Sequence, residues 1–506
     1  MKKTRILSAI LAMLMLTAPL ASCATGDGYG ETLGPQQTVA NDEADTDIKD
    51  ELPSDLNYGG QEITIISRDM EGWTRGEVSV EGLNSDPVND SVFERNKMVE
   101  TRLNIKINSI LDKDTDSSAV PNKVATAVKA GTGEYDLMAA AAYTTASESL
   151  NGTFANLRNT EHIDFEKPWW TQGYNEAMTY EDMQFTVTGS LLLSIYRFAF
   201  VTIFNKDLFT EANQPFLYDT VEKGEWTLDK QISLVPVFHR DNGNGQQDAE
   251  GDIYGFVSSN VIGTDPYWSS CDIDILRVNG DGELEMVFDV NKLYESAEKI
   301  LKLYYGTDSA SYVLSAYGTD SEQEDIRNMF SQGLAAMATL RVMELENSSM
   351  RNMTDEYGVI PMPKFDTVQQ DYRTLLHDQF TVYAVPTTVT GDKLDMVSDV
   401  LEAMGSASWK IVKPAYYETT LRTKIAQDPQ SAMMMDIIVD GIYIDAGIIY
   451  YSAVGDFQAK MRSMLTSTQN NSTSVFTATL AKAKRSIQSG LIDRLDDLAD
   501  AAAEGE

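Results

Sequence analysis

The sequence predicts an α/β protein with two lobes and a helical C-terminal region. Apolar, β-branched runs alternate with helical periodicities between residues 61 and 140, which is the order expected of a parallel sheet covered by helices. The folded part, from about residue 58 to about residue 500, exceeds what a single hydrophobic core accommodates. We therefore expect two lobes, with a ligand bound at the carboxyl ends of their strands.

The first predicted elements alternate between the two-residue periodicity of strands and the 3.6-residue periodicity of helices. Residues 61–67 alternate and are β-branched, which predicts a strand. Asp86 and Pro87 form an N-cap and first-turn pair for a helix that runs to about residue 102. The next expected elements are a strand at 105–110, a helix at 121–130 and a strand at 135–140.

The alternation of apolar strand-like runs and helical patterns resumes after residue 180. Apolar runs follow at 185–192 and 200–205. The chain is expected to cross between lobes near residues 190–205 and 375–390, as the family resemblance given below implies. From Lys393 onward helical patterns dominate. Further strands are expected at 333–340, 357–362 and 377–385, and an amphipathic helix at 475–498.

The N-terminus indicates export. Basic residues precede an apolar run from Ile6 to Leu20, which is typical of a signal peptide over residues 1–22 and is too short for a transmembrane helix. The closing residues Leu20-Ala-Ser-Cys23 resemble the lipobox of bacterial lipoproteins, in which the cysteine is acylated and becomes the new N-terminus. The alternative is an ordinary signal peptide with a chance cysteine. We expect a protein on the extracellular face of the cell membrane, held by lipid (palmitate) on Cys23.

Charge and cysteine content exclude several classes of function. The net charge of −37 repels phosphate backbones and anionic lipid, so no nucleic acid and no membrane contact beyond the lipid are expected. The only other cysteine is Cys271, so an intramolecular disulfide in the body of the protein and a cysteine zinc site are excluded. Residues 23–57 are acidic and poor in large apolar side chains, which predicts a disordered linker before a two-lobed domain at 58–500.

Five segments in order resemble the extracellular solute-binding proteins of ABC importers (family 1), in the branch that serves sugars and oligosaccharides in clostridia-like bacteria. The segments span roughly residues 60–460. They are Asp86-Pro-Val-Asn-Asp-Ser-Val-Phe-Glu-Arg-Asn96 with residues 102–106, Val187-Thr-Gly-Ser190 with Phe204-Asn-Lys-Asp-Leu208, Gly224-Glu-Trp-Thr-Leu-Asp229, Tyr357-Gly-Val-Ile-Pro-Met-Pro-Lys364 and Pro414-Ala-Tyr-Tyr-Glu418 with Leu421, Lys424, Asp428 and Ser431.

The resemblance implies a type II periplasmic-binding-protein-like fold, with a ligand cleft between two hinged lobes and delivery to a membrane permease. It implies a monomer that binds a small carbohydrate and needs no cofactor, and it leaves the solute unidentified. Two positions depart from the family pattern: Ser190 stands where an acidic residue is usual, and residues 334–337 lack the usual bulky aromatic. Both departures affect residues expected near the cleft.

Candidate ligand contacts follow from the needs of sugar recognition, which uses flat aromatic faces and a few planar polar groups. Trp73 follows the first strand among polar neighbours, and Arg341 ends a late strand, although packing and an interlobe ion pair are the respective alternatives. The remaining candidates follow strand ends, lie in the first crossing, or lie in later loops: Tyr143, Thr144, Ser194, Tyr196, Arg197, Trp268 and Tyr450.

One loop resembles a calcium site. Calcium loops of the EF-hand type place oxygen ligands at alternate positions, with Gly at the sixth. If Gly245 takes that position, Asn242, Asn244 and Asp248 become ligands, while Asp241 and Asp252 lie one residue from the first and last ligand positions. A degenerate Ca²⁺ site and a plain solvated turn both fit this pattern.

We expect no enzymatic activity. The sequence has three histidines and lacks a Gly-x-Ser-x-Gly elbow, a His-Glu-x-x-His motif and a P-loop. Two alternatives to a transport receptor remain open, namely a surface lipoprotein that captures or senses glycans and a lipid-anchored glycoside hydrolase, whose carboxylate pair the sequence cannot reveal.

Overall fold

The computed structural model describes residues 48–505, apart from 250, 281, 288, 316–320 and 466–472. The predicted signal peptide, Cys23 and the linker up to residue 47 therefore lie outside the described residues. Residues 48–506 form one compact unit. Within the described ranges, no helix combines the length and the hydropathy needed to cross a lipid bilayer.

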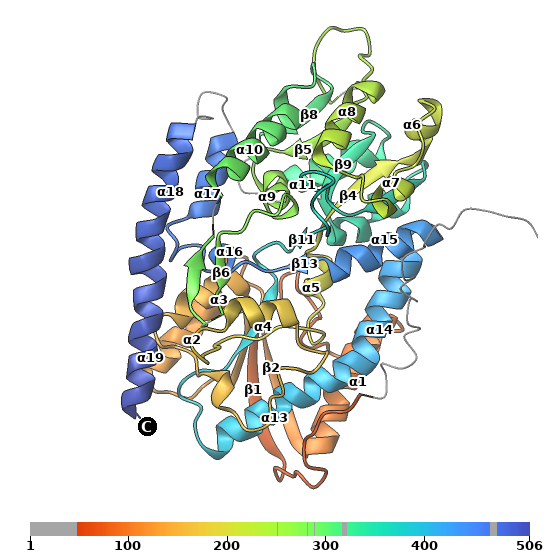
Figure 1. Cartoon of the computed structure of the whole chain (residues 1–506). Helices are drawn as coiled ribbons and strands as arrows, with labels where there is room; N and C mark the ends of the chain where they lie inside the picture. Colours follow the sequence, from red (N-terminus) through yellow and green to blue (C-terminus); the bar gives the residue numbers. More distant parts are fainter. Residues whose placement is uncertain are drawn as a thin grey trace, which may run out of the picture. The chain divides into compact units, whose positions relative to one another are not determined.

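Lobe 1 is built on a four-stranded sheet in the order β12-β3-β1-β2. Figure 1 labels two of its strands, β1 and β2. β1 (Gln61–Arg68) pairs in parallel with β2 (Ile105–Asp112) and β3 (Leu137–Ala141), as the alternation of strands and helices predicted. β12 (Thr381–Ala384) adds the antiparallel edge next to β3. The carboxyl ends of β1, β2 and β3 thus share one edge of the sheet.

The first helix of lobe 1 begins where the sequence predicted, and the second begins two residues earlier than predicted. The Asp86 side chain accepts hydrogen bonds from the N–H groups of Val88 and Asn89 and so caps α1 (Pro87–Leu103). Trp169 and Trp170 are fully buried below α13 (Asp392–Ala407). The other helices on this part of the chain are α2 (Ala119–Ala130), α3 (Ala142–Ser149), η2 (Leu157–Asn159) and α4 (Gln172–Met178).

Lobe 2 is built on a mixed sheet in the order β10-β4-β9-β5-β8. β4 (Phe200–Asn205) runs antiparallel to both β10 (Tyr357–Ile360) and β9 (Met337–Arg341), whereas β5 (Phe256–Ser259) runs parallel to β9 and β8 (Ser311–Leu314). Helices around this sheet are α6 (Lys206–Glu211), α7 (Tyr218–Glu222), α8 (Leu228–Phe238), η3 (Ile262–Thr264), α9 (Asp265–Ser270), α10 (Val290–Tyr305), α11 (Ser321–Ser331), η4 (Val342–Glu346) and α12 (Ser348–Arg351).

Two segments carry the chain between the sheets. The first contains the short helix α5 (Ser194–Arg197) and enters β4. The second contains β11 (Thr374–Leu375) and enters β12, and Ala199 and Leu376 form an antiparallel bridge between the two segments. Small two-stranded sheets pair β11 with β13 (Ile442–Tyr443) and β6 (Leu276–Val278) with β7 (Leu284–Met286).

The region after α13 is helical, as predicted. Three stretches are π-helical: η5 (Ser408–Val412), η6 (Tyr417–Ile425) and η8 (Gln488–Ile492). The predicted amphipathic helix at 475–498 is α18 (Thr473–Ile487), η8 and α19 (Asp493–Gly505) in sequence, drawn dark blue at the side of Figure 1. The remaining helices are α14 (Lys413–Tyr416), α15 (Pro429–Asp440), α16 (Ala446–Ile449) and α17 (Phe457–Leu465).

The end of the predicted linker differs from the sequence prediction. Residues 48–57, expected to belong to a disordered linker, pack on lobe 1, since Leu52 is buried and Asp50 forms an ion pair with Arg102 on α1 (2.5 Å). Ile48 and Leu56 also pack against this core, and Glu51 forms a second ion pair with Lys167 (2.9 Å). Composition alone does not reveal these contacts. Within the apolar run at 185–192, Val187 and Gly189 form isolated bridges to Tyr383 and Trp170.

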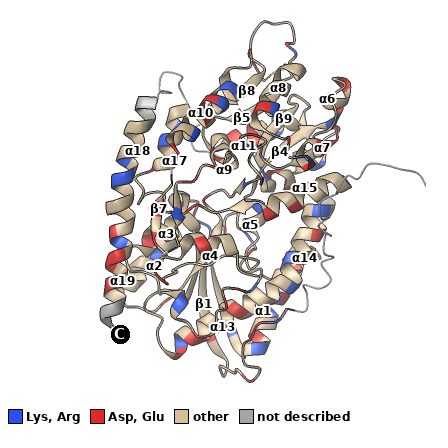
Figure 2. Ribbon diagram, in the orientation of Figure 1, with Lys and Arg blue, Asp and Glu red and all other residues tan. Residues whose placement is uncertain are grey.

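Acidic and basic residues are interspersed on the helices of both lobes (Figure 2). Figure 2 shows both colours on α1, α10 and α13. The negative charge of the chain is therefore distributed over its helices.

Candidate functional site

The candidate site lies where the end of β1 in lobe 1 meets the end of β9 in lobe 2. Trp73, in the loop after β1, makes edge contacts with Phe198 (5.3 Å between ring centroids) and His377 (5.5 Å). The guanidinium of Arg341, the last residue of β9, lies 4.5 Å from the Trp73 ring centroid. A cation over an indole face is stabilising, and more so when it is removed from water. Arg341 is 0% exposed and Trp73 is 8% exposed, so the lobes meet here in a closed contact.

A second arginine approaches the same indole. Arg68 ends β1, and its guanidinium lies 5.8 Å from the Trp73 ring centroid. Arg341 is oriented by Glu344, which accepts a hydrogen bond from its Nη2 (2.7 Å) and another from Arg327. The aromatic face of Trp73 is therefore surrounded by planar, fixed hydrogen-bond donors.

Further side chains extend this site toward the C-terminal helices. Tyr143, at the start of α3 in lobe 1, hydrogen-bonds Ser117 (2.6 Å) and makes an edge contact with Tyr451 (6.2 Å between centroids). Arg462 of α17 donates to Asp265 of lobe 2 (2.7 Å). We call this set the interlobe cluster, and its members are Arg68, Trp73, Tyr143, Asp265, Arg341, His377, Asp378, Tyr451 and Arg462.

Electrostatics in the interlobe cluster are those of a buried, arginine-rich environment. Burial raises the pKa of Asp378 to about 6, and the field of Arg462 opposes that rise. Burial lowers the pKa of His377 well below its ordinary value, and the arginines, Arg341 first, lower it further. His377 is therefore neutral at physiological pH, whereas Asp378 is mostly ionised.

The structure brings three of the predicted ligand contacts into the interlobe cluster: Trp73, Tyr143 and Arg341. Trp268 lies in α9, three residues beyond Asp265, and is 2% exposed. Thr144 donates its hydroxyl to the Ser117 carbonyl (2.9 Å), which ties α3 to the loop before α2. That these residues contact a ligand stays a prediction.

The other four predicted contacts lie elsewhere. Tyr450 is buried one residue before Tyr451, and burial raises its pKa to about 12. Tyr196 is buried against Tyr416 (5.9 Å) and Tyr417 (6.2 Å). Ser194 and Arg197 belong to the hinge network described below. α5 is a single helical turn, so its side chains project to different sides of the crossing segment.

Sequence reasoning did not name five members of the interlobe cluster as ligand contacts, and it named Tyr451, beside Tyr450, as a residue able to cap the pocket. Arg68 closes a predicted strand, and His377 and Asp378 lie in a predicted crossing, so their positions carried a usable signal. Asp265 immediately precedes Pro266 at the start of α9, as an acidic residue often does at a helix start. Arg462 is brought in by the packing of the C-terminal helices, for which no local pattern exists.

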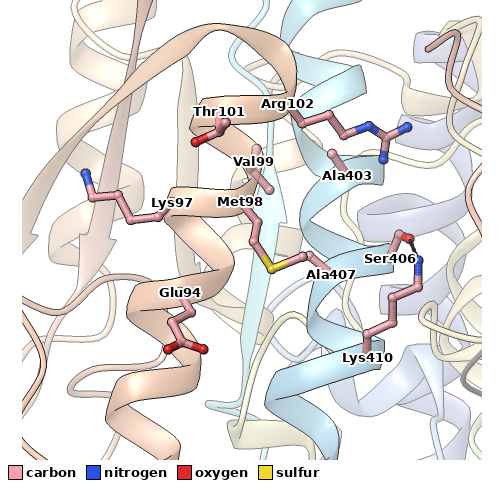
Figure 3. Close-up of a pocket in the computed structure, with 10 residues that line it drawn as sticks. All are labelled: Glu94, Lys97, Met98, Val99, Thr101, Arg102, Ala403, Ser406, Ala407 and Lys410. Atoms are coloured by element: carbon pink, nitrogen blue, oxygen red, sulfur yellow. Dashed lines mark hydrogen bonds between the residues drawn. The ribbon is translucent and has the colours of Figure 1, made fainter.

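The hollows on the described part of the chain include a large cavity and a smaller groove. A cavity of about 950 Å³ extends from Arg75 and the 79–89 loop of lobe 1 to Glu346 and Arg351 of lobe 2, with Arg197 and Tyr416 on its wall. We call it the rear cavity. A groove of about 550 Å³ runs between α1 and α13, as Figure 3 shows, with Met98, Val99 and Ala407 on its floor and Lys410 donating to Ser406 (3.3 Å). The groove contains none of the predicted site residues.

In the loop predicted to bind calcium, the described residues hydrogen-bond one another. Asp252 accepts hydrogen bonds from the Asn242 N–H (2.9 Å) and the Tyr254 hydroxyl (3.0 Å), and Asn244 donates its side-chain amide to Asp248 (2.7 Å). Asp241 accepts from the Gly243 N–H (2.6 Å). Among the residues that the structure describes, no three His, Cys, Asp or Glu side chains are grouped as metal ligands. Calcium binding stays a prediction.

No protein-family profile matches the sequence, and no curated protein matches it. Solved structures do match. The galacto-N-biose-/lacto-N-biose I-binding protein of the ABC transporter from Bifidobacterium longum, in complex with lacto-N-biose, is 15% identical with a TM-score of 0.55 over 86% of this chain and 98% of that chain. The ABC substrate-binding protein Lmo0181 from Listeria monocytogenes, in complex with cycloalternan, is 14% identical with a TM-score of 0.50 over 85% and 99%.

A third match is UgpB from Mycobacterium tuberculosis in complex with glycerophosphocholine, at 13% identity and a TM-score of 0.54 over 85% of this chain and 98% of that chain. At these identities the likeness is one of fold. The chain has the two-lobed α/β fold of these binding proteins, with its cleft between the lobes, as the sequence predicted.

Proposed function

We propose that this protein is a lipid-anchored extracellular receptor of an ABC importer that captures a carbohydrate between its lobes and delivers it to the permease. The observation that carries the proposal is the contact between Trp73 of lobe 1 and Arg341 of lobe 2 at the strand ends, in a fold shared with sugar-binding ABC receptors. An aromatic face next to planar donors is the chemistry that recognises sugars.

Capture would use hinge closure. Ligand favours the closed state only as far as it binds that state better than the open one. Trp73 and Arg68 come from lobe 1, whereas Arg341 and Asp265 come from lobe 2. A solute that touches both sets gains all of its contacts only when the lobes are together, so its binding energy drives closure.

Export and anchoring rest on the sequence. The Leu20–Cys23 segment supports acylation at Cys23, and the acidic residues that follow support a linker between the lipid and the folded lobes. In this proposal the protein contacts the membrane through the lipid alone, and the permease recognises the closed conformation of the two lobes.

Calorimetry with a panel of glycans tests the function. The panel comprises maltotriose, maltotetraose, lacto-N-biose and cycloalternan, with glycerophosphocholine and oligopeptides as comparison ligands. We expect one glycan to bind with a stoichiometry of one and to be recovered unmodified. Binding of peptides with failure of every glycan overturns the carbohydrate assignment, and release of smaller sugars identifies a glycoside hydrolase.

Uptake distinguishes transport from sensing. We expect cells that lack this chain to lose uptake of the radiolabelled glycan found by calorimetry, and re-expression of the chain to restore it. Unchanged uptake in cells without the chain assigns it to glycan capture or sensing without transport.

A further inference from the structure

Buried hydrogen bonds locate the hinge. Glu77, 1% exposed and part of lobe 1, accepts a hydrogen bond from the Ser194 N–H (3.0 Å) and another from the Thr381 hydroxyl. Thr381 also donates its N–H to the Ser194 hydroxyl (2.9 Å). Both crossing segments are therefore fixed to lobe 1 at these residues. On the other side, Val342 of lobe 2 donates to the Ala199 carbonyl (2.9 Å), which fixes residue 199 to lobe 2.

Only residues 195–198 and the stretch around 377–380 lie between these fixed points. Two adjacent residues of the first of these stretches face different surroundings. Phe198 contacts Trp73 and His377 in the interlobe cluster, whereas the preceding residue, Arg197, lines the rear cavity. The hinge thus separates the interlobe cluster from the rear cavity, and Arg197 belongs to the rear side.

Arg197 contacts both lobes from the hinge. Its guanidinium donates to the carbonyls of Gly72 (3.2 Å) and Trp73 in lobe 1, and to the Glu346 carboxylate in lobe 2 (2.9 Å from Nη2, 3.1 Å from Nε). The Tyr416 hydroxyl donates to the same carboxylate (2.6 Å), so Glu346 is itself oriented. The Arg197 side chain is 12% exposed, which strengthens these charge-assisted bonds.

We propose that Arg197 is the positioning residue for Trp73. Its planar guanidinium holds the main chain of the Trp73 loop and is locked to lobe 2 by Glu346, so the angle between the lobes and the position of the indole are set together. A lysine at this position offers a single point charge and cannot hold two carbonyls and a carboxylate in this geometry. This inference rests on the proposed function, because Trp73 is the side chain that stacks on the ligand there, and Arg197 is the residue that positions it.

The test observes Trp73 directly, in the full chain solubilised in detergent and labelled with 5-fluorotryptophan. The ¹⁹F resonance of Trp73 is assigned by its loss in Trp73→Phe. We expect Arg197→Met and Arg197→Lys each to move this resonance by more than its linewidth, and Glu346→Gln to move it in the same direction by a smaller amount. The matched control is Arg351→Met, which removes an exposed arginine from the same cavity and is expected to leave the resonance in place.

An unmoved Trp73 resonance in Arg197→Lys and Arg197→Met overturns the proposal. An equal movement in Arg351→Met overturns it as well, since any loss of positive charge from the cavity would then suffice. If Arg197→Met does not fold, the Trp73 resonance in Arg197→Lys and Glu346→Gln decides the question in the same way. The measurement needs no ligand, so failure of every glycan in calorimetry overturns the proposed function and leaves this test unaffected.

Discussion

The clearest quantitative prediction concerns Glu402, a carboxyl group buried in the core of lobe 1. It lies on α13 and is 0% exposed, and its Oε2 accepts hydrogen bonds from the indole N–H groups of Trp169 (3.3 Å) and Trp170 (3.2 Å). Burial raises its pKa from 4.5 to about 8, because desolvation of the carboxylate outweighs the two indole donors. The native protein therefore holds a proton here at neutral pH.

The sign of the pH effect follows from this proton. Between pH 4.5 and pH 8 the folded chain keeps the proton of Glu402 and the unfolded chain releases it, so stability falls as pH rises through this window. Each pH unit is equivalent to about 1.4 kcal/mol, and the cumulative loss at pH 8 is about 5 kcal/mol. Glu402→Gln keeps an acceptor for the indoles and cannot ionise, so it removes this contribution.

We expect Glu402→Gln and the native chain to have similar stability at pH 4.5, and the variant to gain steadily until it is about 5 kcal/mol more stable at pH 8.5. Urea unfolding followed by near-ultraviolet circular dichroism at pH 4.5, 6, 7 and 8.5 measures the difference. Glu94→Gln, at an exposed position of α1, serves as the matched control with a flat difference. A constant difference between Glu402→Gln and the native chain across this range refutes the reasoning.

Three further predictions concern the anchor, the metal and the ligand face. Cys23→Ser is expected to release the protein into the medium or leave its signal uncut, and a correctly processed variant in the membrane fraction would contradict acylation. A calcium ion in the loop at 241–252 contributes about 2.7 kcal/mol when free metal is 100 times its Kd, so EGTA should lower the Tm of calcium-loaded protein; an unchanged melting curve identifies a solvated turn. Trp73→Ala should weaken binding of the panel glycan by about 10- to 100-fold, by analogy with base–aromatic stacking at ~1–3 kcal/mol. Full affinity together with lost stability would instead assign Trp73 to the core.

Local signals made the fold of lobe 1 predictable. The β-branched alternation of residues 61–67 and the Asp86 cap of α1 are properties of short segments, and both appear in the structure at the expected residues. The pairing of β4 with β9 and β10 is antiparallel, and it joins residues more than 130 positions apart. No local pattern encodes such pairing, so the mixed sheet of lobe 2 could not be predicted in detail.

The candidate site was predictable to the extent that strand ends define it. Trp73 and Arg341 follow or end strands, and the structure brings them to 4.5 Å. Arg197 and Phe198 are neighbours in the sequence, yet one lines the rear cavity and the other faces Trp73. The orientation of one helical turn decides which of these two residues faces the cleft. Amino-acid composition does not predict that orientation.

The long C-terminal helix gives the hinge a mechanical limit. α18 packs against α10 of lobe 2, whereas α19 reaches lobe 1, where Arg494 donates to the Leu150 carbonyl (3.0 Å) and Asp496 accepts from Tyr180. Any rotation of the lobes must be absorbed by this helix, and the π-helical turn at Gln488–Ile492 is where its regular bonding is already interrupted.

Gly490 holds that turn against the neighbouring chain, since a Cβ there would lie 2.2 Å from the Ala453 carbonyl oxygen. The helix is thus a further connection between the lobes, beside the two crossing segments. Under the proposed hinge closure, this connection restricts the angles that the lobes sample without solute, so solute binding costs less conformational entropy.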